Sequence, residues 1–152
     1  MRFFSAVLFA SLLLVACGDK PSVEQQIITT LRVMEEAAEN GEHFEFIGYV
    51  SDSFKGQQGS MDRRGFHRFM IYQLNQKRRL QAQFFPIYVQ ESDPDSASAS
   101  FRVLVTGGAG LLPESGRVFD VETQWQRDGG DWMLEMANWE AVQLPDVPSL
   151  GK

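Results

Sequence analysis

The period of the hydrophobic pattern changes near residue 80, and this change limits the fold more than any other feature of the chain. Before that point, apolar residues recur every three or four positions, as they do on one face of an α-helix. After it, apolar and polar residues alternate, as in strands that bury one face of a sheet. Helices followed by strands predict an α+β domain, with the helices on one face of a curved antiparallel sheet.

Three helices are expected in the first half of the chain. Ser22 and Gln25 have the spacing of a capping box, and the apolar stripe behind them continues to Asn40, so a long amphipathic helix is predicted there. A short helix is expected over residues 43–49, where the helical spacing ends before a run of polar residues. Asp62 is the expected cap of a third helix with a basic C-terminal end.

Four strands are expected in the second half, over residues 80–90, 97–105, 119–126 and 132–142. Pro86 lies within the first of them and requires a bulge or a sheet edge, because proline has no backbone N–H to donate. The segment Asp128-Gly129-Gly130-Asp131 predicts a tight hairpin between the last two strands. The expected sheet is therefore four-stranded and antiparallel.

The N-terminal segment has the pattern of a secretory signal. A positive Met1-Arg2 precedes an apolar run from Phe3 to Val15 that is interrupted only by two serines. Residues 3–16 would span only about 21 Å as a helix, which is less than the ~30 Å hydrocarbon core of a bilayer. A cleaved signal is therefore favoured over a membrane-spanning helix.

The end of this run, Leu14-Val15-Ala16-Cys17, resembles the lipobox of bacterial lipoproteins. The resemblance implies a signal peptide over residues 1–16, attachment of diacylglycerol to the Cys17 thiol, and a tether over residues 17–21. Two or more acyl chains would give stable membrane anchoring. The alternative is a chance cysteine in an ordinary signal peptide. Since this is the only cysteine in the chain, no internal disulfide can form.

The residues after the lipobox bear on which membrane would hold the protein. In lipoproteins of enteric bacteria, Asp directly after the modified cysteine retains the protein at the inner membrane. Here Gly18 occupies that position and Asp19 follows. The resemblance therefore implies the outer membrane, facing the periplasm, with the inner membrane as the alternative.

Three features of the mature chain resemble a known family: the element order, the segment Tyr49 to Phe54, and the closing hairpin from Val121 to Trp139. In these features the chain is similar to the nuclear transport factor 2-like (NTF2-like) superfamily, also called SnoaL-like. It covers residues 22–142 and implies a cone-like arrangement of three helices on the sheet, followed by a tail over residues 143–152. Enzymes of this superfamily use a deep pocket between sheet and helices, with an Asp, Glu, His or Tyr for proton transfer.

Five residues are candidates for such a pocket. Asp120 and Glu122 alternate with apolar residues on the third expected strand, so either could serve as a general base if it faced the cavity. Alternation more often places polar residues outward, which is the favoured interpretation. Tyr49, Tyr88 and Asn138 could line the same cavity, although core packing explains them equally well.

Other kinds of chemistry have little support in the sequence. The only two histidines, His43 and His67, do not form a recognisable dyad, and His67 lies among arginines in an expected solvated setting. No metal-binding motif occurs, and no cofactor is implied. The glycine cluster at residues 107–110 lacks the spacing and the following helix of a phosphate-binding loop.

A basic stretch accompanies the third helix and carries six of the 14 Lys and Arg residues: Arg63, Arg64, Arg68, Lys77, Arg78 and Arg79. It could bind anionic headgroups, lipopolysaccharide phosphates or an acidic partner. A solvated helix face is the plainer alternative. The net charge of −6 argues against nucleic acid as a partner.

Three functions follow from the sequence. The leading hypothesis is a non-enzymatic, lipid-anchored envelope protein whose domain binds a small apolar ligand or a partner protein. The second is an isomerase, dehydratase or hydrolase that uses Asp120 or Glu122 as base. The third is a structural subunit of an envelope assembly, with a homodimer as one expected arrangement.

Overall fold

The computed structural model describes residues 20–76, 80–107 and 115–142. The predicted signal peptide, Cys17 and the tail over residues 143–152 lie outside the described residues. The elements in chain order are α1 (Val23–Asn40), α2 (His43–Gly48), β1 (Val50–Gly56), the short 3-10 helix η1 (Gln57–Gly59), β2 (Met61–Asp62), α3 (Arg63–Gln76), β3 (Leu80–Phe84), β4 (Tyr88–Asp93), β5 (Ser96–Gly107), β6 (Ser115–Asp128) and β7 (Asp131–Ala141).

Helix α1 begins and ends where the sequence predicts, and α3 begins at its predicted cap. Ser22 and Gln25 form the complete capping box of α1, and Gly41 ends that helix in the left-handed conformation with φ 75°. Asp62 accepts a hydrogen bond from the backbone N–H of Gly65 at 2.7 Å, which caps α3. None of the described helices combines the length and apolar character needed to span a membrane.

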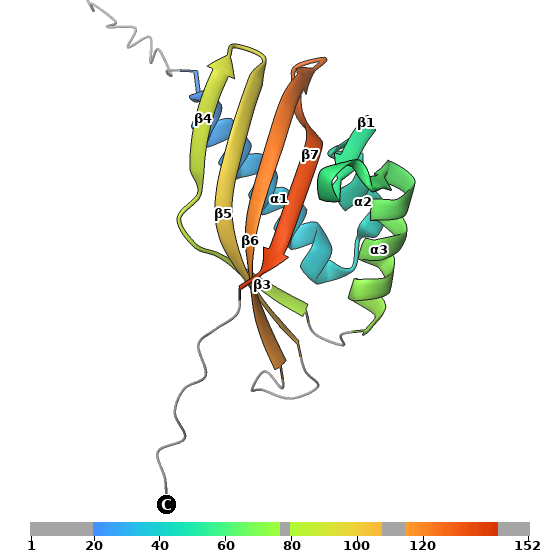
Figure 1. Cartoon of the computed structure of the whole chain (residues 1–152). Coiled ribbons are helices and arrows are strands. Elements are labelled where there is room, and N and C mark those ends of the chain that lie inside the picture. The colour runs from blue at the N-terminus through green and yellow to red at the C-terminus, as the bar shows by residue number, and fades with distance from the viewer. Residues whose placement is uncertain (1–19, 77–79, 108–114, 143–152) are drawn as a thin grey trace, which may run out of the picture.

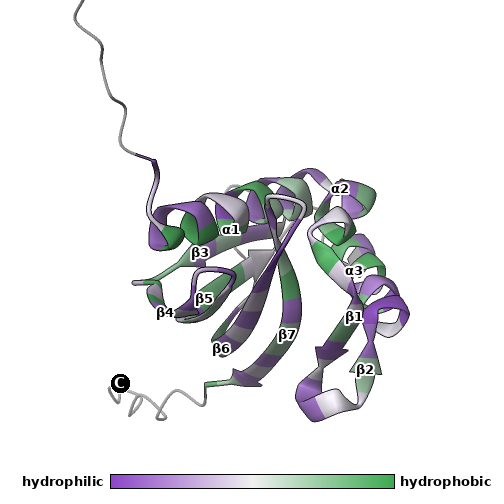
Figure 2. Ribbon diagram, turned by 90° about the horizontal axis from the view of Figure 1, so that it is seen from above, coloured by the Kyte–Doolittle hydropathy of each residue, from purple (hydrophilic) through white to green (hydrophobic). Residues whose placement is uncertain are grey.

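The described strands form one curved, mixed sheet in the order β2-β1-β7-β6-β5-β3, with β4 also paired to β5. Figure 1 shows α1 running across the back of the long strands, with α2 and α3 beside β7 and β1. Seen from above in Figure 2, the sheet curves beneath α1. The predicted hairpin between β6 and β7 is confirmed, and Gly129 and Gly130 take the positive φ values that its turn requires.

The prediction of a four-stranded antiparallel sheet is wrong because residues 50–56 form strand β1, which runs parallel to β7. The sequence did not indicate this strand, since its pairing shifts register between Val50 and Lys55 and breaks the simple alternation. Its partner residues lie more than 80 positions later, beginning with Leu134 opposite Val50. Local periodicity carries no information about such a distant pairing.

The single strand predicted over residues 80–90 is two strands, β3 and β4, separated by Phe85, Pro86 and Ile87. Both pair with β5 and lie at the edge of the described sheet. Pro86 therefore breaks the strand at an edge, which agrees with the predicted constraint but goes further than a bulge.

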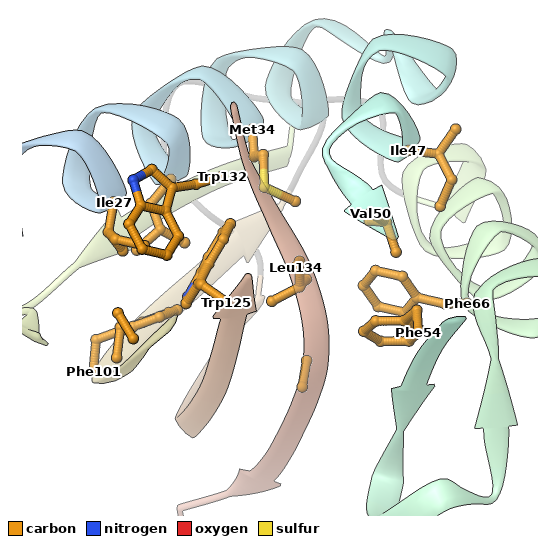
Figure 3. Packing of buried hydrophobic residues seen from close by; sticks show 14 residues of the cluster. Ile27, Met34, Ile47, Val50, Phe54, Phe66, Phe101, Trp125, Trp132 and Leu134 are labelled. Atoms are coloured by element: carbon orange, nitrogen blue, oxygen red, sulfur yellow. The ribbon is translucent and has the colours of Figure 1, made fainter. Parts of the chain in front are cut away.

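The core fills the space between α1, α3 and the sheet (Figure 3). Trp125 and Trp132 pack beneath α1, while Phe54 and Phe66 stack at a ring-centroid distance of 4.8 Å nearer α3. All four side chains are buried, with Trp125 only 2% exposed. Such aromatic side chains bury large areas, so they supply much of the hydrophobic stabilisation of this domain.

Candidate functional site

The described part of the sheet has almost no polar side chains on its inward face. Thr123 is the only polar or charged side chain that is buried among the described residues. Its hydroxyl donates to the carbonyl oxygen of Ala99 at 2.9 Å and accepts from the indole N–H of Trp125 at 2.8 Å. These bonds satisfy Thr123 and fix the Trp125 ring. The described interior therefore contains no buried carboxylate or imidazole that could act as a base.

The two carboxylates considered as bases lie on the opposite, outer face of the sheet. Asp120 and Glu122 are both exposed, and Asp120 accepts a hydrogen bond from Nε of Arg102 at 2.6 Å. This contact raises the pKa of the Arg102 guanidinium. Asn138 on β7 pairs with Glu122 on β6. Asn138, Asp120 and Glu122 line an open hollow of about 490 Å³. Both side chains are exposed, as the favoured interpretation of the alternation predicts, and the two carboxylates do not face a concave pocket beneath the helices.

The two candidate tyrosines lie in different places. Tyr88 is 70% exposed on β4 and lines a second outer hollow, of about 310 Å³, together with Glu122 and Met136. Tyr49 lies at the end of α2, where its carbonyl oxygen accepts a hydrogen bond from the Leu134 N–H at 2.8 Å. The proposed common cavity of Tyr49, Tyr88 and the carboxylates is therefore not formed.

The basic stretch divides into a structural and an exposed part. Arg63 donates from its guanidinium to the carbonyl oxygens of Val50 and Ile47, each at 2.9 Å, and so ties α3 to α2 and β1. Arg64 and Arg68 are exposed. The three basic residues at 77–79 lie outside the described residues.

The charge around the start of α3 acts on Asp62. The hydrogen bond from the Gly65 N–H is the main cause that lowers the pKa of the Asp62 carboxyl. Partial desolvation of the carboxyl opposes this lowering of the pKa. The positive charges of Arg68, Arg64 and Lys55 add to the lowering. Asp62 is thus held as an anion at the N-terminus of α3, where its negative charge interacts favourably with the helix dipole.

A partly apolar surface covers the outer side of α2 and α3. We call Phe44, Arg64, Arg68, Ile71 and Tyr72 the α2–α3 surface. Phe44 is 75% exposed and Tyr72 is 60% exposed. On α3 the members follow helical spacing, and a shallow hollow of about 480 Å³ is lined by Arg68, Ile71, Tyr72 and Asn75. Arginine beside exposed aromatic side chains is a composition typical of protein interfaces.

The two histidines form a contact that the sequence did not predict. Nδ1 of His43 lies 3.1 Å from Nε2 of His67, and the ring of Phe44 packs against both imidazoles. Burial is the largest cause that lowers the pKa of His67, followed by the charges of His43 and Arg63. The rings come from positions 24 residues apart, and no local pattern joins them.

Comparisons with known proteins agree with this architecture. An NTF2-like protein of unknown function from Pseudomonas putida KT2440 superposes with a TM-score of 0.67 at 13% identity, over 84% of this chain and 93% of that one. A candidate dehydratase of the NTF2-like family from Streptomyces avermitilis gives 0.68 at 13% identity, over 79% and 96%. The fold is NTF2-like.

The similarity to known proteins lies in the structure and not in the sequence. Bd1075 of Bdellovibrio bacteriovorus superposes with a TM-score of 0.67 at 8% identity over 78% of this chain, which spans only 41% of that protein. No protein-family model matches the sequence, and a search of curated proteins finds no significant match. The likeness therefore concerns the NTF2-like fold alone.

Within this NTF2-like domain, the place where the resemblance implied a pocket holds the aromatic core. Among the described residues, no group of three or more His, Cys, Asp or Glu side chains is arranged to hold a metal ion. The exposed aromatic side chains of the α2–α3 surface lie on helices whose sequence periodicity pointed mainly to their buried faces. These helices contain more apolar residues than one buried stripe requires. That excess was the feature of the sequence that could have indicated exposed aromatic side chains.

Proposed function

We propose that this protein is a lipid-anchored envelope protein whose NTF2-like domain binds a partner protein through its surface and catalyses no reaction. The observation that carries the proposal is the interior, which is filled by Phe54, Phe66, Trp125 and Trp132. Proton transfer in such a fold would need a base inside the domain with a pKa tuned by its surroundings. The described interior contains none.

The packed core also favours a protein partner over a small apolar ligand. Pockets for small molecules are concave, largely apolar and able to bury most of the ligand. The hollows on this domain are open and lie on its outer surface, lined by polar and charged side chains as well as Tyr72 and Tyr88. A macromolecular partner can use such a surface without an enclosed cavity.

The α2–α3 surface is the proposed contact region. The α3 sequence contains three arginines and no acidic residue, although the whole chain carries a net charge of −6. Phe44 and Tyr72 supply exposed aromatic area, and Arg64 and Arg68 supply charge for an acidic partner. Tyr and Arg are among the residues that most often dominate binding energy at interfaces.

The proposed anchor is the acylated thiol of Cys17. The lipobox-like segment before it supports this assignment, and α1 begins at Val23, so the connecting tether is short. Five extended residues reach at most about 18 Å. We propose that the domain faces the periplasm from the outer membrane, close to the lipid headgroups, so a partner would be found in the envelope.

Site-specific photo-crosslinking in living cells tests the contact region. A photoreactive phenylalanine analogue replaces Tyr72 in one strain and Tyr88 in a second, matched strain. Both native tyrosines are exposed, at 60% and 70%, but they lie on α3 and on the outer face of the sheet respectively. We expect a discrete crosslinked protein from position 72 and none from position 88, measured by immunoblotting and mass spectrometry of the membrane fraction.

Two further changes sharpen the experiment. Arg64→Glu combined with Arg68→Glu should remove the crosslink from position 72, because it reverses the charge offered to an acidic partner. The charge-matched control reverses two exposed arginines of the sheet, Arg102→Glu with Arg117→Glu, and should leave the crosslink unchanged. A crosslink at position 88 alone would move the contact to the sheet, and equal crosslinking at both positions would contradict a specific surface.

A further inference from the structure

Helices α2 and α3 are fastened together at two points one turn apart. At one end of α2, the guanidinium of Arg63 donates to the carbonyl oxygen of Ile47 at 2.9 Å. At the other end, Nδ1 of His43 lies 3.1 Å from Nε2 of His67. The spacing is four residues on each helix, so the two contacts lie on the same seam. Phe46 and Phe66 meet beneath it, with ring centroids 5.9 Å apart.

The Arg63–Ile47 contact and the His43–His67 contact respond differently to acid. A guanidinium keeps its charge at all pH values that a cell meets, so the Arg63 contact persists. The imidazole contact exists only while at least one facing nitrogen is unprotonated, since one ring must donate and the other must accept. Once both rings are charged, the hydrogen bond is lost and two like charges lie 3.1 Å apart.

The positive charges beside His67 oppose its protonation. The groups that act on His67 are His43 from α2 and Arg63 from its own helix. From β1, the exposed carboxylate of Asp52 lies 3.7 Å from Nε of Arg63 and so faces that guanidinium. His67 is half-buried, which adds the cost of placing a charge away from water.

We propose that His43 and His67 form an acid-sensitive latch that holds α2 against α3 near neutral pH and releases it in acid. Release at the histidine end, with Arg63 still bound at the other, turns α2 away from α3 and uncovers Phe46. The latch lies at the edge of the α2–α3 surface, because Phe44 packs against both imidazoles. The latch requires the contact between the two imidazoles and does not require that the α2–α3 surface binds a partner.

The direction of the pH dependence follows from the lowered pKa of His67. In the unfolded or released state His67 binds its proton near the ordinary pKa of 6.5, whereas in the latched state its pKa is lower. The released state therefore binds more protons in that interval, and the latch loses stability as the pH falls below about 6.5. Above that value, the latch should be fully formed and insensitive to pH.

Hydrogen exchange of the backbone amides at residues 46–49, corrected for the direct effect of pH on chemical exchange, measures the release. We expect protection of these amides in the purified protein to fall on the order of tenfold between pH 7 and pH 5, because the hydrogen bond is replaced by like-charge repulsion. Amides in the middle of α1, measured in the same samples, should keep their protection.

A matched variant isolates the pair. His43→Asn with His67→Gln places neutral amide groups where Nδ1 and Nε2 lie, and it leaves no histidine in the chain, since these two are the only ones. Protection of residues 46–49 in this variant should not change between the two pH values. If the double variant does not fold by circular dichroism, His43→Asn alone serves, because one charged ring then faces no second one. An equal change in wild type and variant, or none in wild type, overturns the latch.

Discussion

Replacing Trp125 with alanine should lower the free energy of unfolding by about 3–5 kcal/mol, the usual loss for a large aromatic side chain removed from a packed core. Trp125 is only 2% exposed and packs between α1 and the long strands. The change also removes the indole N–H that donates to Thr123 at 2.8 Å. For a domain of this size, the midpoint of thermal unfolding should fall by roughly 10–20 °C. Circular dichroism during heating and urea denaturation measures both quantities.

The matched control is Phe44→Ala, which removes another aromatic side chain but at a position that is 75% exposed. Its effect on the free energy of unfolding should stay within about 0.5 kcal/mol, because little apolar surface is buried there. Equal destabilisation by the two changes would show that Trp125 does not lie in the principal core.

Replacing Cys17 with serine should abolish lipid attachment, because serine offers no thiol for the thioether bond. Metabolic labelling with palmitate should mark the wild-type protein and leave the Cys17→Ser variant unlabelled. Mass spectrometry should find wild-type protein without its first 16 residues and with lipid mass added. Each buried methylene contributes about 0.8 kcal/mol, so two or more chains should hold nearly all of the wild-type protein at the membrane.

Membrane association alone would not separate the two proteins, since an uncut signal segment could also retain the variant. Labelling and the N-terminal mass are therefore the deciding readouts. Ser11→Ala, a change inside the apolar run that leaves the cysteine in place, should be labelled like wild type. A labelled Cys17→Ser protein, or an unlabelled wild type, would rule out the proposed anchor.

The parts of the fold that were predictable are those specified by neighbouring residues. The capping box of Ser22 and Gln25, the cap at Asp62 and the turn at Gly129 and Gly130 each act over a few positions, and all three form. Strand β1 could not be predicted in this way. Val50 pairs with Leu134, and the amide side chain of Gln57 bonds the backbone of Trp139 across 82 positions.

The candidate site was less predictable for the same reason. Alternation along β6 separates two faces but does not say which one the helices cover, so the sequence favours, without establishing, the exposed position that Asp120 and Glu122 take. Arg63 appeared as one more residue of a basic run, yet it is bonded to two backbone carbonyls. The contact between His43 and His67 depends on how α2 meets α3, which no spacing in the sequence encodes.

A filled interior cannot take up a small apolar molecule, so the domain would act through its surface. Indole binding, followed by the ¹H–¹⁵N NMR spectrum, reports whether the interior is filled. We expect no shift of core signals with indole in wild type, whereas Trp125→Ala should take up indole in the vacated space and regain thermal stability. Indole binding inside the wild-type core, with shifts around Phe54 and Trp125, would show that the core is not filled and would restore an internal ligand pocket.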